Sequence, residues 1–347
     1  MVAELTTSGD PGQNSRGNPL LTRVRPAHQF MRRPLVTLVG QRVALAVPLL
    51  MLVSALSYLL VSLTPGDAAV SILGPTAPPE AYDNLRHTLG LNEPVYKQYG
   101  HWLGQALQGD LGRSLFSGQA VSEMIVQRLP VTLWLIGGAL LVSLIAGVGL
   151  GMLSVTGRFG LGRLADLVAV IGFAMPAFWI GVELVAIFAV KLRWLPAIGY
   201  VSPEQSLTGW LRSLILPVTA LSLHGIAVLA KQTREALLDV LNSEFVHDAR
   251  SNGIPERSIL FRHAFKNIAP RIATVLGVQA VVMLGGSVLV ENVYALPGLG
   301  SLIVSAAVQH DLPLVQGVAV CFTIFVVVIN LLIDFICMAL NPRSATW

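Results

Sequence analysis

Charged side chains are scarce in this chain of 347 residues, since Asp, Glu, Lys and Arg together make up only 12% of it. A soluble globular domain carries about 25% charged residues, whereas here 54% of the residues are hydrophobic and the mean hydropathy is +0.68. The composition excludes an ordinary soluble protein and indicates an integral membrane protein in a lipid bilayer. The net charge of +4 does not indicate a nucleic-acid partner, because in a membrane protein the positive charges set topology.

Cysteine is nearly absent as well. Cys321 and Cys337 both lie in one apolar stretch, form no CxxC motif and have no histidine at metal-binding spacing. A disulfide framework and a zinc site are therefore both disfavoured. We expect no bound metal or cofactor in this chain, and we interpret the two cysteines as small residues that face lipid or a neighbouring helix.

Sequence motifs for ATP hydrolysis and for catalysis are missing. A P-loop needs Gly-Lys followed by Ser or Thr, but the chain's lysines follow Tyr96, Val190, Ala230 and Phe265. No HExxH motif occurs, and no Ser/His or Asp/Asp set lies at a plausible depth on facing apolar segments. We expect no catalytic residue, and a membrane-embedded enzyme is disfavoured. An ion-coupled secondary transporter is also disfavoured, because such proteins usually contain two related repeats with interrupted helices, and the sequence shows no such pair of repeats.

Long apolar runs dominate the chain. About 20 apolar residues cross a bilayer as a helix. We predict an all-α integral membrane protein with six transmembrane helices, at Val43–Leu63, Val131–Val155, Leu164–Val190, Ser213–Ala230, Ala273–Val293 and Pro313–Leu340. The fourth run is the weakest, because Pro217, Ser222 and His224 interrupt it.

The positions of lysine and arginine predict the orientation, since cytoplasmic loops carry an excess of both. With the N-terminus inside, the inner segments hold sixteen of them: Arg16, Arg23, Arg25, Arg32, Arg33, Arg42, Arg158, Arg163, Lys231, Arg234, Arg250, Arg257, Arg262, Lys266, Arg271 and Arg343. The outer segments hold seven: Arg86, Lys97, Arg113, Arg128, Lys191, Arg193 and Arg212. We therefore predict that both termini are cytoplasmic.

The segments outside the helical core have distinct compositions. Residues 1–41 are predicted to be a disordered cytoplasmic arm, because residues 1–30 are rich in Gly, Ser, Asn, Pro and Arg without apolar periodicity. The first transmembrane helix is then expected over 42–63. An extracytoplasmic loop follows over 64–130, then a core of five helices over 131–340 and a cytoplasmic tail over 341–347.

Short helices are predicted inside the extracytoplasmic loop, over Ala81–Leu89 and Pro94–Leu107. The second carries an apolar stripe, made of Val95, Tyr99, Trp102, Leu103 and Leu107. This amphipathic helix could lie on the membrane surface, receive a soluble partner, or simply pack on the ends of the transmembrane helices.

The densest polar patch between two apolar runs is EFVHDARSNGIPERSILFRHAFKNIAP, residues 244–270, which we call the charged hairpin. Phe245 and Ala249 are predicted to share a helical face, with Gly253 at the end of that helix and Pro255 at the first position of the next, the usual placement of Gly and Pro. The second helix is expected to be amphipathic, with an apolar stripe and neighbouring aromatic and basic residues, Leu260, Ala264, Ile268, Phe261, Phe265, Arg257, Arg262 and Lys266.

Two interpretations of the charged hairpin remain open from spacing alone. Its helices could lie on anionic lipid as a positive-inside loop, or they could dock a soluble protein. The glycine favours docking slightly, because a small residue at a tight turn lets another backbone come close.

Two polar residues lie inside apolar runs, where they could line a path across the bilayer. Glu183 lies near the middle of the third run, where an acidic side chain costs about 2.5–3.5 kcal/mol on insertion scales, so it could face a path or be a hydrogen-bonded packing residue. His224 could line the same path, but a lone histidine is more often an interhelical hydrogen-bonding residue.

Motifs along most of the chain resemble one family. The charged hairpin is similar to the EAA loop of ABC importer permeases, with Ala249 and Gly253 at the motif's second alanine and its glycine. Over residues 32–343 the chain resembles the first-subunit permeases of dipeptide, oligopeptide and nickel importers through TPGD (Thr64–Asp67), LGLNEPVYKQYGHWL (Leu89–Leu103), GDLGRSL (Gly109–Leu115), MPAFWIG (Met175–Gly181), WLPAIGY (Trp194–Tyr200), ENVYALPGLG (Glu291–Gly300), DLPLVQG (Asp311–Gly317) and LNPR (Leu340–Arg343).

The resemblance implies a type I ABC importer permease fold in a bacterial cell membrane. It implies partners: a second homologous permease subunit, two ABC ATPase subunits that bind ATP–Mg, and an extracytoplasmic solute-binding protein. The EAA loop of this family forms a coupling helix in a groove of an ATPase subunit. The residues that the resemblance assigns to coupling are Phe245, Ala249, Gly253, Ile254, Pro255 and Arg262.

The substrate is less constrained than the class. Relatives of this type import di- or oligopeptides, nickel, glutathione or haem. Peptide is the expectation that the resemblance favours.

Overall fold

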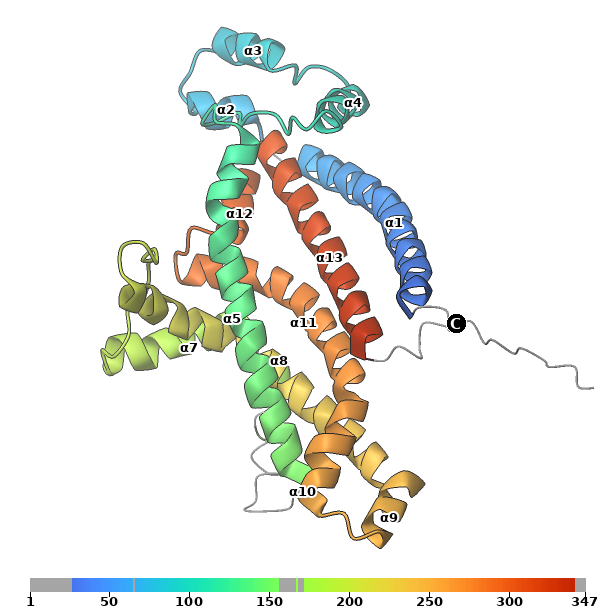
Figure 1. Ribbon diagram of the computed structural model, residues 1–347. Helices are drawn as coiled ribbons and strands as arrows, with labels where there is room; N and C mark the ends of the chain where they lie inside the picture. Colours follow the sequence, from blue (N-terminus) through green and yellow to red (C-terminus); the bar gives the residue numbers. More distant parts are fainter. Residues whose placement is uncertain (1–26, 65, 156–166, 168–171, 341–347) are drawn as a thin grey trace, which may run out of the picture. The chain divides into compact units, whose positions relative to one another are not determined.

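The computed structural model describes residues 27–64, 66–155, 167 and 172–340, with side chains from residue 40 onward. The chain divides into two units, residues 1–40 and 41–347. All regular elements of the described residues are helical, and their only β pairing is an isolated bridge between Arg113 and Ala120 (Figure 1). This all-helical architecture agrees with the predicted fold class.

The expected disordered arm over residues 1–41 falls mostly on residues 1–26, which lie outside the described residues. Helix α1 covers Ala27–Leu63, so the helix begins well before the predicted start at residue 42. Good helix formers such as Met31 and Leu35 extend the apolar run backward, and glycine first occurs in it at Gly40. The first helix of the structure therefore starts earlier in the chain than the boundary predicted between the arm and this helix.

Five helices of the described residues are long and apolar enough to cross a bilayer: Gly40–Leu63 within α1, α5 (Val121–Val155), α8 (Leu207–Leu241), Glu256–Val293 and α13 (Leu312–Leu340). All five begin before the predicted start, α13 by one residue and the others by three to seventeen. In α5, α8 and the helix over Glu256–Val293 the extension includes polar residues that hydropathy alone leaves out. In α5, for example, the helix runs through Pro130 and starts ten residues before the expected Val131.

The third predicted span, Leu164–Val190, is not a continuous helix where it is described. Part of it lies outside the described residues. The rest bends at Met175 before α7 (Ala177–Leu184) and a π-helical segment, η1 (Val185–Lys191). Pro176 causes the break, since proline disfavours the helical conformation of the residue before it.

A long connection, residues 64–120, joins α1 to α5. It contains α2 (Ala68–Leu73), α3 (Pro79–Thr88) and α4 (Val95–Ala106), so both helices predicted in this region are confirmed to within two residues. Asp67 caps α2 through its side chain, which accepts a hydrogen bond from Ala69 N at 2.8 Å. Within the predicted stripe of α4, Tyr99 stacks on buried Trp102 and meets Tyr58 of α1, whereas Leu107 is exposed.

Small residues let α5 and α8 pack closely. A Cβ atom at Gly147 would lie 2.7 Å from Leu229 Cβ, and one at Gly151 would lie 2.6 Å from Thr233 Cβ. Real Cβ atoms do not come so close, so these glycines are required for the contact rather than for bending. The main apolar core adds α7 and α11 (Phe265–Val293) to this pair, around Leu135, Ala220 and Tyr294.

Buried carboxylates fasten the loops on either side of α12 (Leu299–Gln309). Glu291, which is fully buried near the end of α11, accepts hydrogen bonds from Thr132 Oγ1 (2.7 Å) and Ser301 N (3.0 Å). Asp311, also buried, accepts from the Ser114 hydroxyl and from Leu115 N (3.1 Å), and thereby ties the long connection to the start of α13.

Candidate functional site

The charged hairpin folds into a short helix, a tight turn and a longer helix (Figure 1). Helix α9 covers Glu244–Ser251, and α10 (Glu256–Ser258), the π-helical η2 (Ile259–Ala264) and α11 continue one another after the turn. The predicted helix–turn–helix is therefore confirmed. Pro255 immediately precedes the second helix instead of being its first residue, a shift of one position.

Gly253 has the left-handed backbone conformation, with φ = +73°. Its N–H donates to Arg250 O (2.9 Å), and Ile254 N donates to Ala249 O (3.1 Å), which closes the end of α9. A Cβ atom added at Gly253 would meet no atom within 4 Å. Within this chain, then, the glycine is required for its backbone conformation, and the space beside it is open.

The inner face of the hairpin is a small aliphatic cluster. Val246 and Ile259 are fully buried and Ala249 is 6% exposed, with Ile254 packed beside them. Phe245 and Ala249 lie four residues apart in α9 and so share a helical face as predicted, but Val246 occupies the buried position and Phe245 is 49% exposed. Residues three apart on a helix lie side by side as readily as residues four apart, and the aliphatic side chain is the one that fits this small cluster.

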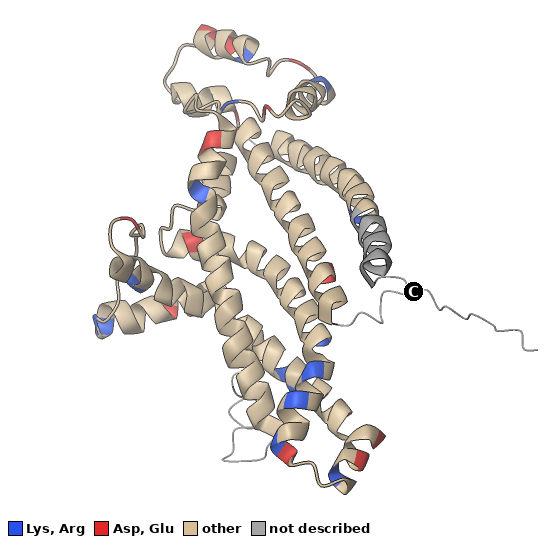
Figure 2. Cartoon of the chain, in the orientation of Figure 1, with Lys and Arg blue, Asp and Glu red and all other residues tan. Residues whose placement is uncertain are grey.

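The outer face carries exposed aromatic and basic side chains. Phe261 is 64% exposed, and the Phe245 ring lies 5.9 Å from the His263 ring, measured between centroids. The other exposed members are Phe265, Arg257, Arg262 and Lys266. Lys and Arg residues gather around α9 and the start of α11 (Figure 2).

An ion pair bridges the turn from one helix to the next. Arg250 Nε donates to Glu256 Oε1 at 2.6 Å, and this hydrogen bond raises the pKa of the Arg250 guanidinium. Both side chains are largely exposed, so the pair contributes little to stability. The pair links the end of α9 to the start of α10 across Gly253.

The residues that the family resemblance assigns to ATPase coupling differ in their exposure. Phe245, Gly253, Pro255 and Arg262 are exposed, Ile254 is half-buried and Ala249 is buried. Exposed large aromatics next to arginine are the side chains enriched in protein–protein interfaces, where they provide most of the binding energy. The arrangement can thus present a rigid knob to a partner, with an aliphatic inner face that holds its shape.

The two candidate path residues, Glu183 and His224, differ in the contacts that they make. Glu183 is exposed on α7 and has no hydrogen-bond or ion-pair partner among the described residues. His224 of α8 is half-buried, its Nδ1 lies 3.0 Å from Gly172 O, and its ring meets Phe173 edge to face. His224 therefore makes the kind of contact expected of an interhelical hydrogen-bonding residue. Glu183 makes no hydrogen bond within the described residues that would mark it as a hydrogen-bonded packing residue.

Glu291 is the residue that sequence reasoning missed. The motif ENVYALPGLG contains it, and a carboxylate at the end of an apolar run followed by LPGLG is a signal that could have identified it. Cβ atoms at Gly298 and Gly300 would come within 3 Å of its carboxylate, so the loop wraps tightly around it. Val246 and Ile259 were likewise not singled out, because only their burial in the folded hairpin distinguishes them.

Comparison with known proteins identifies the class of protein that this helical core and hairpin belong to. The model of the family "Binding-protein-dependent transport system inner membrane component" matches residues 147–346, and the model of that family's N-terminal component matches residues 35–136. The chain belongs to this family of membrane permeases.

Individual relatives agree with that family. A putative peptide transport system permease protein of Brucella suis biovar 1 is 40% identical over 312 residues, which are 89% of this chain and 99% of the relative. A probable peptide ABC transporter permease protein of Sinorhizobium fredii is 38% identical, over 87% of this chain and 97% of the relative. The glutathione transport system permease protein GsiC of Escherichia coli K12 is 35% identical, over 85% and 94%.

Solved structures show the same fold at lower identity. An inward-facing structure of the MetNI methionine ABC transporter covers 63% of this chain and 97% of its own, with a TM-score of 0.50 and 18% identity. A second inward-facing structure of that transporter gives a TM-score of 0.51 with 16% identity. The helical core therefore has the fold of an ABC importer permease.

Proposed function

We propose that this chain is a permease subunit of an ATP-driven importer of di- or oligopeptides in the bacterial inner membrane. The family and the fold establish a transport permease, and relatives named as peptide permeases support peptide as the cargo. The observation that carries the coupling proposal is the charged hairpin, with its buried aliphatic face and exposed aromatic and basic face. Exposed aromatic side chains next to arginine are typical of protein–protein interfaces, so this surface supports docking of a soluble partner.

In the proposed complex the partners divide the work. Two ABC ATPase subunits bind ATP–Mg, a second homologous permease completes the translocation path, and an extracytoplasmic solute-binding protein delivers the peptide. This chain supplies half of the path and, through Phe245, Arg262 and the turn at Gly253, a coupling contact to one ATPase. It hydrolyses no ATP itself, since its lysines occur in no P-loop motif.

The proposed topology has six transmembrane helices with both termini in the cytoplasm. The sixth helix would come from residues 164–190, whose described part is apolar but broken at Pro176. Arg42, near the start of the first span, donates to Asp334, near the end of α13, at 2.5 Å, which supports a common side of the membrane for the two termini. The excess of Lys and Arg around the charged hairpin supports a cytoplasmic position for that end.

Glutathione is the alternative cargo that a specific observation favours, because GsiC is 35% identical over most of its length. Glutathione is itself a tripeptide, so one path could accept both. Uptake of radiolabelled dipeptides, oligopeptides, glutathione and nickel by a deletion strain and by the complemented strain tests the proposal. We expect the complemented strain to regain uptake of dipeptides or oligopeptides. If complementation restored uptake of neither, peptide import would be refuted.

A further inference from the structure

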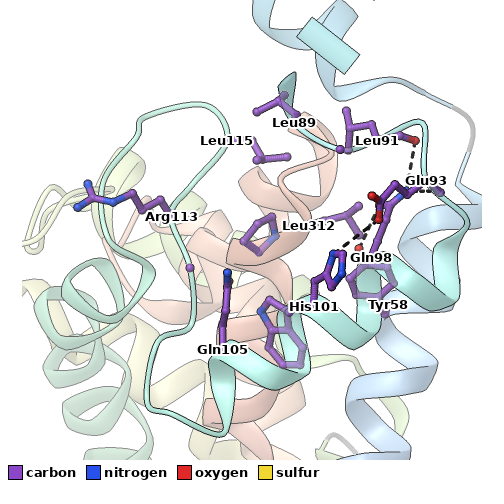
Figure 3. A pocket seen from close by; sticks show the side chains of 14 residues that line it. Tyr58, Leu89, Leu91, Glu93, Gln98, His101, Gln105, Arg113, Leu115 and Leu312 are labelled. Carbon is purple, nitrogen blue, oxygen red and sulfur yellow. Dashed lines mark hydrogen bonds and ion pairs between the residues drawn. The ribbon is translucent and has the colours of Figure 1, made fainter. Parts of the chain in front are cut away.

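A pocket of about 260 Å³ lies in the part of unit 41–347 formed by the long connection. Its walls come from α4, from the loops on either side of it, from Tyr58 of α1 and from the start of α13 (Figure 3). Pockets for drug-sized ligands measure about 300–1,000 Å³. This pocket is slightly smaller, which is the size range of an amino acid or a dipeptide.

One side of the pocket is apolar and the floor is held rigidly. The apolar lining is Leu89, Leu91, Leu115, Leu312 and Pro313. Gln98 ties the floor together, since its Nε2 donates to Leu91 O (3.2 Å) and to Glu93 O (2.7 Å) while its Oε1 accepts from the Tyr58 hydroxyl (3.2 Å). A site whose walls are fixed before binding loses little conformational entropy when a ligand enters.

The opposite side offers hydrogen-bonding groups with unused capacity. Glu93 lies only within a loose ion pair, 3.6 Å from His101 Nδ1, and both side chains are substantially exposed. Arg113 does not neutralise it: its side chain points away from the other lining side chains (Figure 3) and donates to Gly118 O at 3.1 Å. The side-chain amide of Gln105 forms no hydrogen bond with any described residue.

Trp102 adds an unsatisfied donor to the same wall. The residue is 7% exposed, and its Nε1 has no acceptor among the described residues. A buried donor without a partner costs about 1–3 kcal/mol. A ligand carbonyl or carboxylate that reached Nε1 after a small shift of the wall would recover that free energy.

We propose that this pocket binds a short zwitterionic ligand, a free amino acid or a dipeptide with an apolar side chain. The ammonium group lies against Glu93, the carboxylate or a carbonyl against the Gln105 amide and Trp102 Nε1, and the apolar side chain among the leucines. This is a binding site separate from the charged hairpin. The site itself needs only the pocket, whereas its use in receiving imported peptide rests on the proposed function.

The test is binding of radiolabelled glycyl-leucine to the full chain in lipid nanodiscs, measured by equilibrium dialysis. We expect saturable binding that weakens about tenfold when the peptide is N-acetylated, because acetylation removes the ammonium and so one charge-assisted hydrogen bond. Glu93→Gln should weaken binding of glycyl-leucine to a similar extent, and the affinity for the N-acetylated peptide should hardly change in this variant.

Matched variants locate the binding. Gln105→Leu should also weaken the binding of glycyl-leucine. Glu80 is an exposed carboxylate on α3 outside the pocket lining, so Glu80→Gln should leave this binding unchanged. Absence of saturable binding to the wild-type chain would overturn the proposal, and so would equal binding of the free and N-acetylated peptides. Unchanged binding in both pocket variants would overturn it too. A strain that takes up no peptide, while the purified chain still binds it here, would refute the proposed function and leave the site standing.

Discussion

The two ends of the helical segment formed by η2 and α11 differ in how they are covered. The end that belongs to the charged hairpin carries exposed aromatic side chains, and the opposite end carries a fully buried carboxylate. At the first end, Phe261 and Phe265 contact solvent in the isolated chain. At the second, Glu291 binds Thr132 and Ser301 and is enclosed by the Gly298–Gly300 turn. One end is thus stabilised by this chain itself, whereas the other offers apolar area that only a partner can cover.

The largest expected effect comes from breaking the self-contained end. Glu291→Leu would leave the Thr132 hydroxyl and Ser301 N–H without their buried acceptor, which should cost about 2–4 kcal/mol of folding free energy. We expect a lower melting temperature of the purified protein in detergent and reduced membrane levels. Glu123→Gln, at an exposed carboxylate of α5, is the control. An unchanged melting temperature in Glu291→Leu would show that this carboxylate does not hold α12 in place.

Substitutions at Gly253 separate backbone conformation from contact with a partner. A left-handed conformation costs a residue with a Cβ about 1–2 kcal/mol, but asparagine tolerates it better than alanine. Gly253→Trp should preserve membrane insertion and abolish most coupling, because it fills the open space where the ATPase is proposed to come close. Uptake and co-purified ATPase are the measurements.

Two smaller substitutions at Gly253, to Asn and to Ala, distinguish a requirement for backbone conformation from a requirement for close contact with a partner. If conformation alone matters, Gly253→Asn should retain more uptake than Gly253→Ala. If a partner backbone lies against the glycine, both should lose uptake to a similar degree. Normal uptake together with normal ATPase association in Gly253→Trp would contradict the proposed contact at this turn.

The exposed end can be weakened without disturbing the fold. Phe261→Ala removes the most exposed aromatic of the hairpin, and truncation of an interface anchor typically costs 1 kcal/mol or more. We expect the affinity for the ATPase subunit to fall about tenfold while the melting temperature of the isolated chain stays constant. Phe116→Ala is the matched control, since Phe116 is 50% exposed but lies in the long connection. Equal loss of affinity in both variants would show that the effect is not specific to the hairpin.

Glu183 should give the smallest effect. If its carboxylate meets the ammonium group of a substrate in the path, loss of an exposed ion pair worth up to about 1 kcal/mol should raise the KM for uptake roughly fivefold. Glu183→Gln keeps the shape of the side chain and so tests the charge alone. Unchanged uptake kinetics at normal expression would assign Glu183 to packing against another subunit.

Much of the fold could be predicted from the sequence, because apolar length and turn residues are local signals. The five long helices of the described residues, α3, α4 and the Gly253–Pro255 turn all follow from them. Pro176 signals the break, but the apolar run continues on both sides of it and so still predicts one span. Hydropathy carries no information on backbone direction, so an apolar run of the right length predicts one continuous helix even where the chain bends.

The details of the candidate site were less accessible. In a helix as short as α9, which of Phe245 and Val246 faces inward depends on one residue of register, and the cluster that decides it includes Ile259 beyond the turn. The partners of Glu291 come from α5, more than 150 residues away, and from α12. Such long-range contacts leave no local pattern in a single sequence.

Site-specific crosslinking from Phe261 tests the central claim most directly. A photoreactive amino acid at this position, in cells that express the whole transport system, should form an adduct with a separate polypeptide that carries a P-loop. The same amino acid at Val308, an exposed position of α12, should form no such adduct. Adducts to lipid alone from position 261, or labelling of that position by a reagent that cannot enter the cell, would contradict the account.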